Sequence, residues 1–420
     1  MHPLSLKSVV LAVVSCAALS VPAAAARLGN LSTRMQVLTG DNVAIAGFVI
    51  DGTASKTVVI TAKGPSLTAY GINNPLPDPT LTLVRMSDQA TLAVNDNWTA
   101  APNASQISAS GFAPTNGLES AILVTLPPGA YTAIVSGVND SVGVGLVEVY
   151  EVDQPQVILS NISTRARVGT GSDVMIGGFV VQGSGPQKVI VTAKGPSLAQ
   201  YGVSGTLPDP AMTLVRATDG AYIANNDNWP AFELADDLRF SGLAPTDTRE
   251  SAVLVTLDPG AYTAIVSGSG EINTGVGLVE VYAWDGIGKL SQPNTSSVHR
   301  GFIGQTYTYH LPRQANGLYG SGFFQQGPDS NTPSELTLEW ALSKVPGDFD
   351  YYQSAAAKVN GNVVCGGVNG AIGATYYWSP TGSFYECKVD SATNWYLNVR
   401  YINNCPPGVR CPVAYYYSES

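Results

Sequence analysis

The chain has 420 residues, of which 45% are hydrophobic and only 12% are charged, while Gly (44) and Pro (27) are frequent. This balance is typical of turn-rich β-proteins with several domains, and it argues against a disordered chain. The net charge of −10 leaves no basic face for phosphates, so we expect no binding to nucleic acids or anionic membranes.

The first 26 residues have the pattern of an export signal. Lys7 precedes an apolar run over 9–21, and a series of alanines up to Ala26 provides a cleavage site. The run is too short for a stable membrane anchor, and we expect no transmembrane segment elsewhere. Lipid attachment at Cys16 is the less favoured alternative. The sequence therefore predicts a secreted or cell-surface protein, periplasmic or extracellular.

Residues 27–154 are repeated as residues 155–286. The segment 61–67 recurs as 192–198, and the segment 95–98 recurs as 226–229. Each copy contains short β-branched runs between Gly, Pro and Asn turns, which predict antiparallel strands. We therefore expect an all-β protein with two tandem, antiparallel β-sandwich or jelly-roll-like modules. Duplicated modules favour binding or spacing over catalysis.

The second half of each copy carries a distinctive series of elements. In the first copy these are the Asn-Asp-Asn-Trp turn at 95–98, a strand over 126–137 and a Gly-rich turn with a final strand over 143–150. The series resembles the pre-peptidase C-terminal-type β-sandwich modules of bacterial exported and surface proteins. The resemblance covers residues 27–286 in two copies and implies an extracellular accessory module without catalysis. The first half of each copy, residues 31–83 in repeat 1, departs from that pattern.

The Asn-Asp-Asn turns are candidate metal sites. The side chains concerned are Asn95, Asp96 and Asn97 in repeat 1 and Asn226, Asp227 and Asn228 in repeat 2. Calcium binds oxygen clusters of this kind, but Asx side chains also bond their own backbone to shape turns. Because no Asp-x-Asp-x-Asp-Gly register is present, a structural turn is the favoured interpretation and calcium the alternative. We expect no other cofactor.

Two glutamates lie within the final apolar strands of the repeats. Glu148 and Glu280 are flanked by Val on both sides, where a buried carboxylate needs a partner. We expect a structural ion pair rather than a catalytic acid. The natural partners are Arg34 and Arg165, or Arg85 and Arg216.

Residues 287–300 are rich in Gly, Ser, Pro and Asn and predict a linker. Residues 301–420 are rich in aromatic residues and alternate as strands do, which predicts a third β-domain stapled by disulfides. The favoured pairings are Cys365 with Cys387 and Cys405 with Cys411, although two other connectivities are open.

Adjacent aromatic residues in this domain point to opposite faces of a strand, so some rings should face solvent. The candidate ligand-binding rings are Tyr376, Tyr377, Trp378 and Trp395. They would stack on a glycan or contact an extracellular protein. The alternative is that the aromatic residues only form a structural β-surface.

The favoured function is a non-catalytic binding or adhesion protein, with the repeats as spacers and the terminal domain as the contact module. No catalytic residue is assigned, because the chain after the signal has two histidines and no Gly-x-Ser-x-Gly elbow. One alternative is a secreted glycan hydrolase with its acids among Glu339, Asp348, Asp350 and Glu386. Another is a stalk stiffened by calcium. The sequence leaves the oligomeric state open.

Overall fold

The computed structural model describes residues 27–153, 159–270, 274–289, 295–301, 305–311, 318–327, 337–351, 358–359, 362–363, 365–369, 375–380, 386–403 and 411–419. Strands dominate these ranges and pair into mainly antiparallel sheets, which confirms the predicted all-β sandwich class. None of the helices in these ranges is long and apolar enough to cross a bilayer. The export signal, Cys16 and Cys405 lie outside the described residues.

Each repeat is a sandwich of two four-stranded sheets. Buried and half-buried side chains alternate along strands such as β2 and β10, so that one face of each sheet is turned toward the core. Repeat 1 forms the sheets β6–β3–β8–β1 and β2–β7–β4–β5, and repeat 2 forms β14–β11–β16–β9 and β10–β15–β12–β13.

The strands of repeat 1 are β1 (Arg27–Val37), β2 (Ala44–Ile50), β3 (Lys56–Lys63), β4 (Pro79–Arg85), β5 (Ala90–Asn95), β6 (Ser120–Leu126), β7 (Gly129–Gly137) and β8 (Gly143–Glu151). Those of repeat 2 are β9 (Leu159–Val168), β10 (Met175–Gln182), β11 (Gln187–Lys194), β12 (Pro210–Arg216), β13 (Tyr222–Asn226), β14 (Ser251–Leu257), β15 (Gly260–Gly268) and β16 (Gly275–Trp284).

Apart from η4, the short helices occupy equivalent places in the two repeats. The α-helices are α1 (Ala104–Ala109) and α2 (Ala235–Ser241). The 3-10 helices are η1 (Gly40–Asn42), η2 (Pro65–Tyr70), η3 (Trp98–Ala100), η4 (Val138–Asp140), η5 (Gly171–Asp173), η6 (Pro196–Tyr201) and η7 (Trp229–Ala231). Of these, η2 and η6 begin at the proline of the Gly-Pro-Ser segments, and this proline sets the backbone for a helical turn.

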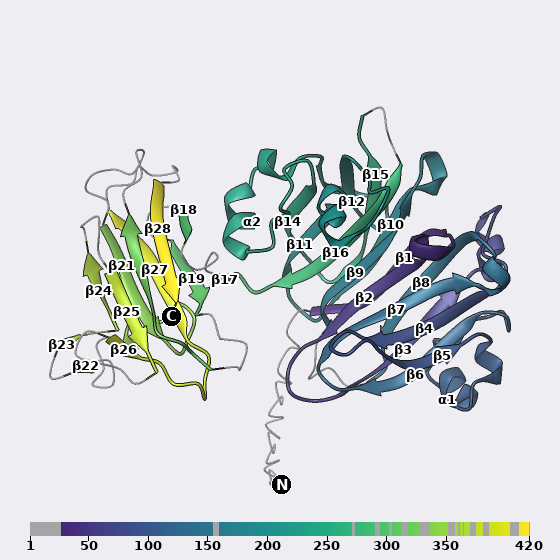
Figure 1. Cartoon of the computed structure of the whole chain (residues 1–420), viewed down its shortest axis with the longest axis horizontal. Coiled ribbons are helices and arrows are strands. Elements are labelled where there is room, and N and C mark those ends of the chain that lie inside the picture. The colour runs from purple at the N-terminus through teal and green to yellow at the C-terminus, as the bar shows by residue number, and fades with distance from the viewer. Residues whose placement is uncertain are drawn as a thin grey trace, which may run out of the picture.

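The repeats are joined edge to edge through both sheets. β1 pairs antiparallel with β10, and β9 pairs antiparallel with β2. β1 and β9 also meet in parallel at Leu28↔Leu159, a pair of equivalent residues. In the core between them, the hydroxyls of Thr33 and Thr164 form a 2.8 Å hydrogen bond. The two copies are thus related by a pseudo-twofold axis, and two eight-stranded runs make up the 16-stranded sheet (Figure 1).

This junction gives the two repeats a common core. One hydrophobic cluster contains buried residues of both copies, including the equivalent pairs Phe48 with Tyr131 and Phe179 with Tyr262. The rings of these pairs stack with centroids 5.5 and 5.8 Å apart. Because pairing covers the edges of β1, β2, β9 and β10, the repeats behave as one folded unit and not as modules on a flexible tether.

The C-terminal residues form a second sandwich, with sheets β17–β19–β27–β21–β24 and β18–β28–β20–β25–β26. Its strands are β17 (Gly288–Lys289), β18 (Thr295–Gly301), β19 (Thr306–His310), β20 (Gly322–Gly327), β21 (Thr337–Ser343), β22 (Lys358–Val359), β23 (Asn362–Val363), β24 (Gly366–Asn369), β25 (Thr375–Ser379), β26 (Glu386–Lys388), β27 (Tyr396–Asn403) and β28 (Cys411–Glu419). The short strands β22 and β23 pair with each other.

The structure corrects the prediction of a linker over residues 287–300. β17 pairs with β19 and β18 pairs with β28, so the sandwich already begins within this segment. Both strands lie at the edges of their sheets, where Ser, Thr and Gly are tolerated because one side of the strand needs no packed neighbour. Polar composition alone therefore did not distinguish an edge strand from a linker.

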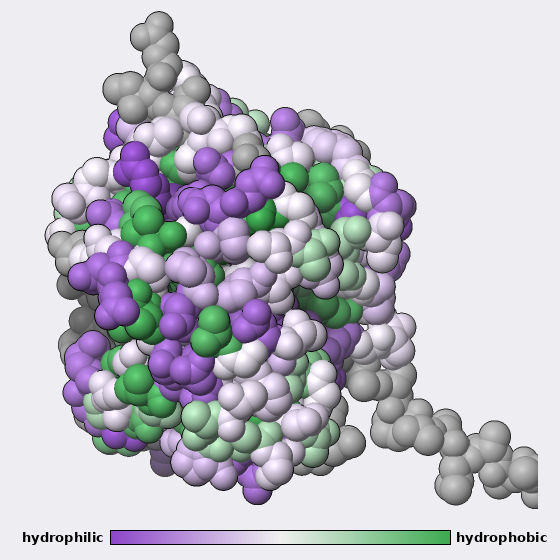
Figure 2. Space-filling view, turned by 90° about the vertical axis from the view of Figure 1, so that its right-hand side faces the viewer, coloured by the Kyte–Doolittle hydropathy of each residue, from purple (hydrophilic) through white to green (hydrophobic). Residues whose placement is uncertain are grey.

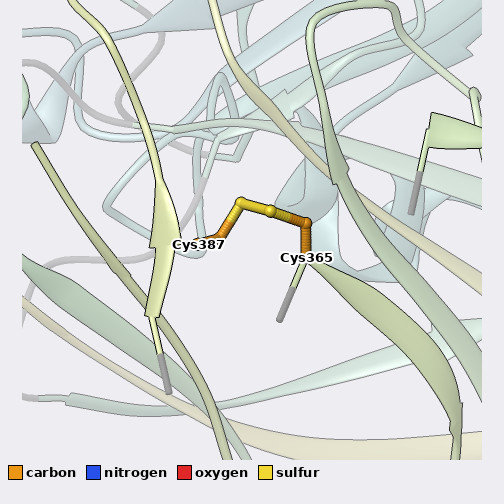
Figure 3. Close-up of a disulfide and its surroundings, with 2 residues drawn as sticks. All are labelled: Cys365 and Cys387. Carbon is orange, nitrogen blue, oxygen red and sulfur yellow. A yellow bond between two sulfur atoms is a disulfide. The ribbon is translucent and has the colours of Figure 1, made fainter. Parts of the chain in front are cut away.

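A disulfide joins the two sheets of this sandwich. Cys365, which precedes β24, bonds to Cys387 in β26, with the Cα atoms 4.8 Å apart (Figure 3). Both residues are buried. This confirms the first of the two predicted pairings, whereas the predicted Cys405–Cys411 bond falls outside the described residues.

Helix α2 connects repeat 2 to the terminal sandwich (Figure 1). The ring of Phe240 packs edge-on against Trp284, Tyr307 and Tyr309, with centroids 5.0 to 6.0 Å away. Repeat 1 has the exposed Ala109 at the equivalent position. The docking surface is therefore specific to repeat 2.

Among the described residues, no further domain packs against the opposite end of the molecule, which repeat 1 forms. Exposed apolar side chains such as Met86, Val94 and Leu118 occur there. Figure 2 shows that hydrophobic spots on this face are small and separated by polar side chains. Scattered apolar residues of this kind are ordinary for a solvent-facing surface.

Candidate functional site

A pocket of about 400 Å³ opens where the two repeats join. Its floor comes from strands of both repeats, and its wall comes from η6 and the loop after α2. The lining residues are Ile45, Gly47, Thr132, Ser163, Arg165, Lys194, Ser197, Leu198, Gln200, Tyr201, Val203, Ala244, Thr246, Leu278 and Glu280. We call this cavity the inter-repeat pocket.

Strand register places the floor residues in two adjacent rows. In one row, Ser163 of β9 lies between Gly47 of β2 and Glu280 of β16. In the other row, Arg165 lies between Ile45 and Leu278. A side chain on Gly47 would meet the Ser163 hydroxyl, since an added Cβ would lie 2.6 Å from it. The glycine therefore keeps the floor open.

Glu280 is held by a lysine of the neighbouring strand. Lys194 Nζ lies 2.6 Å from Glu280 Oε2, and the hydroxyl of Thr192 donates to the same oxygen at 3.2 Å. Burial raises the pKa of the adjacent Tyr282, and the negative charge of Glu280 raises it further. Repeat 1 repeats this pair, with Lys63 Nζ 2.6 Å from Glu148 Oε2.

Glu148 and Glu280 form structural ion pairs, as predicted, with Lys63 and Lys194. The alternative partners Arg85 and Arg216 bind elsewhere. Arg85 pairs with Asp88 and Arg216 with Asp219, three residues along the chain. Each lysine lies on the strand next to its glutamate, two residues beyond the threonine that faces the glutamate, and this diagonal distance is within reach of a long side chain. Which strand would be that neighbour depends on long-range strand pairing, which local sequence patterns do not specify.

Arg165 is the uncompensated charge of the pocket. Its Nε is buried and has no hydrogen-bond partner, and no carboxylate of the described residues lies within ion-pairing distance of it. Since Lys194 and Glu280 neutralise each other, the described lining carries one net positive charge. A buried guanidinium N–H without an acceptor is costly, which makes this position suited to an incoming acceptor group.

The wall of the pocket is fixed by a buried carboxylate. Glu250 Oε1 accepts hydrogen bonds from the backbone N–H groups of Gly195 and Ser197 at 2.9 Å and from the Ser197 hydroxyl at 2.6 Å. Position 195 must be glycine, because a Cβ there would lie 2.0 Å from the carbonyl oxygen of Leu207. These contacts explain the Gly-Pro-Ser segment, and they present Tyr201 at the end of η6 with 78% of its surface exposed.

The predicted metal loops are organised as turns. In repeat 1, the Asn95 amide oxygen accepts from Ala121 N–H at 2.9 Å, and its amide nitrogen donates to the Asn97 carbonyl at 3.2 Å. Asn226 makes the same two bonds in repeat 2. No group of three His, Cys, Asp or Glu side chains suited to a metal occurs among the described residues.

The carboxylates beside these turns are less well satisfied. Asp78 Oδ1, Asp209 Oδ1 and Asp227 Oδ1 are buried without hydrogen-bond partners. Burial raises the pKa of Asp209, and the nearby charge of Asp227 raises it further. The pKa of Asp78 is raised in the same way, by burial and then by Asp96.

The aromatic candidates of the terminal domain separate into two groups. Tyr377 is 43% exposed, whereas Trp378 and Trp395 are each 1% exposed and belong to the core. This corrects the proposal that those two tryptophans bind a ligand, because their rings pack inside the sandwich. The side chain of Tyr376 lies outside the described residues.

Three of the four carboxylates of the hydrolase alternative, those of Glu339, Asp348 and Glu386, have structural partners. Glu339 pairs with Arg400, and Glu386 accepts from the Ser379 hydroxyl at 2.8 Å. Asp348 accepts from the backbone N–H of Asp350 at 2.8 Å. Glu339 and Glu386 also lie in different sheets of the sandwich.

The comparisons with known proteins assign no family to this chain, so the geometry of the site alone indicates what it can bind. A scan against family models found no match, and a search of curated proteins found none.

Sequence reasoning missed the residues that matter most here: Arg165, Lys194 and Tyr201 as members of one pocket. All three recur at the same spacing in repeat 1, as Arg34, Lys63 and Tyr70. That identity was visible in the sequence. What the sequence did not indicate is that strands of one repeat complete a surface of the other.

Proposed function

We propose that this protein is a secreted or cell-surface, non-catalytic binding protein whose inter-repeat pocket holds a carboxylated glycan. The observation that carries the proposal is Arg165, with its buried and unpartnered Nε in the floor of the pocket. A planar guanidinium can present two parallel N–H groups to one carboxylate, a geometry that gives strong charge-assisted hydrogen bonds.

The surroundings of Arg165 suit a sugar. Tyr201 exposes a flat ring beside the cavity, and Ser163 and Gln200 add polar groups that can exchange hydrogen bonds with hydroxyls. Saccharide rings pack against aromatic faces while their hydroxyls bond to polar side chains. This arrangement moves the proposed contact surface from the terminal domain to the repeats, which sequence reasoning treated as spacers.

A binding role is also favoured over hydrolysis by the carboxylates of the pocket. Glu280 is the single carboxylate among the described lining residues, and Lys194 neutralises it. Glycoside hydrolysis ordinarily needs two carboxyl groups, about 5 to 9.5 Å apart, on either side of the scissile bond. The pocket can therefore hold a glycan without cleaving it.

Export is supported by the predicted signal and by the disulfide. A buried disulfide persists in oxidising compartments outside the cytosol. The resemblance of the repeats to pre-peptidase C-terminal-type modules is consistent with an extracellular accessory role, and it remains part of this proposal.

The test uses oligogalacturonate and its fully methyl-esterified form as probes, which differ mainly in charge. We expect the full chain to bind the acid and to lose most of that binding on the neutral ester. Arg165→Gln should weaken binding to the acid about 10- to 100-fold, the effect of losing one charge-assisted pair. Arg216→Gln, which removes an exposed arginine outside the pocket, is the matched control.

A second pair of variants tests the aromatic contact. Tyr201→Ala should weaken binding about tenfold or more, whereas Tyr222→Ala should not, although Tyr222 is also a well-exposed tyrosine of repeat 2. Equal binding of acid and ester, or unchanged binding by Arg165→Gln, would refute the carboxylate contact.

A further inference from the structure

The pseudo-twofold axis relates the inter-repeat pocket to a second surface, at the junction of β1 with β10. Each pocket residue has an equivalent in the other repeat, at a fixed spacing of 131 residues up to the last turn and 132 after it. Thirteen of the fifteen lining residues are identical to their equivalents. The two differences are Gln200, which corresponds to Ala69, and Val203, which corresponds to Ile72.

The pocket-lining residues are more similar between the two repeats than other equivalent residues are. Residues 99–109 and 230–240 are also equivalent, yet only two of those eleven positions are identical. Core packing does not account for the lining residues either, because Tyr70 and Tyr201 are 82% and 78% exposed. A solvent-exposed tyrosine contributes little to folding, so its presence in both repeats points to a shared role at the surface.

The strand register of the second surface matches that of the first. Arg34 of β1 lies between Ile176 and Leu146, as Arg165 lies between Ile45 and Leu278. Ser32 lies between Gly178 and Glu148, which repeats the row of Ser163.

The wall of the second surface is held in the same way. Glu119 Oε1 accepts from the N–H groups of Gly64 and Ser66 at 2.9 Å and from the Ser66 hydroxyl at 2.6 Å. These are the distances found for Glu250 in repeat 2.

We infer that the junction around Arg34 is a second binding site for the same class of ligand, so that one chain holds two carboxylated sugar units. This inference rests on the proposed function, because it transfers the ligand class of the inter-repeat pocket. Ala69 in place of Gln200 removes one hydrogen-bonding group, and the second site is therefore the weaker of the two. Two sites on one rigid body favour a polymer with repeated carboxylates, since the second contact becomes intramolecular.

The experiment is calorimetric titration of the full chain with short oligogalacturonate, too short to span both sites. We expect two ligands per chain, falling to one in Arg34→Gln, one in Arg165→Gln and none in the double variant. The control variant Arg216→Gln should still bind two ligands per chain. Ala69→Gln should narrow the difference in affinity between the sites. Thermal unfolding of each variant establishes that it is folded.

The outcomes separate this inference from the proposed function. The second site would be overturned, and the first left intact, by three results together. The natural chain would bind one ligand, Arg34→Gln would still bind one ligand, and Arg165→Gln would bind none. Absence of binding to any carboxylated glycan would overturn both. Two ligands that survive the double variant would place the sites elsewhere on the chain.

Discussion

At the scale of single residues, the most consequential groups are two buried carboxylates, each of which directly precedes a strand. Glu119 and Glu250 are fully buried, and one oxygen of each fixes a Gly-Pro-Ser segment. The other oxygen, Oε2, is buried without a hydrogen-bond partner in both repeats. These glutamates position the pocket wall without contacting a ligand themselves.

Glu250→Ala should destabilise the repeats by about 3–5 kcal/mol, because it removes the acceptor of three hydrogen bonds and leaves two backbone donors buried. Chemical denaturation measures this change. The matched control is Glu233→Ala, since Glu233 is exposed and should tolerate substitution within about 0.5 kcal/mol. Similar losses in both variants would contradict the role assigned to Glu250.

Asp209 gives a prediction with a defined pH dependence. Burial raises its pKa, and Asp227 raises it further, so the folded state disfavours the charged form. The stability linked to this group is present below the unfolded pKa of about 3.9 and is lost as the pH rises through the folded pKa. Asp209→Asn should therefore stabilise the protein at pH 7, by less than about 1 kcal/mol, and have little effect near pH 3.

Thermal melts at both pH values measure the effect of Asp209→Asn. The same melts test the calcium alternative. Millimolar calcium that stabilises the natural chain, and not Asp209→Asn, would make this carboxylate a calcium ligand. Destabilisation by Asp209→Asn at pH 7 without calcium would contradict the charge argument.

At the scale of elements, the first two strands of each repeat decide how the molecule is assembled. β1 and β2 are edges within repeat 1, and they are covered by β10 and β9 of repeat 2. A repeat on its own would expose both edges, and exposed edges pair with any matching strand.

Repeat 2 expressed alone, as residues 159–286, should form a homodimer in which β9 and β10 of one copy pair with β10 and β9 of the other. Light scattering coupled to gel filtration measures the mass. The fragment 27–286 should be monomeric, because its edges are already paired. A stable monomer of the single repeat would show that the edge pairing contributes little to the fold.

Helix α2 carries the docking surface of the terminal sandwich through Phe240. Phe240→Ala should cost about 3 kcal/mol and split thermal unfolding into two transitions, as the terminal domain loses its contact with repeat 2. Tyr377→Ala, at an exposed ring of the terminal domain, should keep the natural unfolding profile. A single transition in Phe240→Ala at unchanged temperature would contradict this assignment.

The elements were predictable from the sequence to the extent that local pattern determines them. β-branched runs and Gly, Pro and Asn turns predicted the strands, and the Asn95 and Asn226 turns use their side chains as Asx chemistry suggests. The pairing of β1 with β10 was not predictable, because edge partners depend on long-range register and not on local propensity. For the same reason the sequence indicated neither the pocket nor the lysine partners of Glu148 and Glu280.

At the scale of the whole molecule, the duplication of the repeat determines how the sandwiches are joined. Fusion of two sandwiches through both sheets creates two equivalent junctions, and each junction combines residues of both repeats. The terminal sandwich docks on α2, which belongs to repeat 2 alone. Under the proposed function, the fused repeats bind the ligand, and the terminal sandwich packs beside them on α2.

The most direct test compares two fragments, residues 27–286 and residues 287–420, with the full chain for binding to oligogalacturonate. We predict that the fragment 27–286 retains the affinity of the full chain within about threefold, because both junctions are complete within it, and that the fragment 287–420 does not bind. Binding by the terminal fragment, with none by the repeats, would contradict the central claim and return the contact surface to the terminal domain.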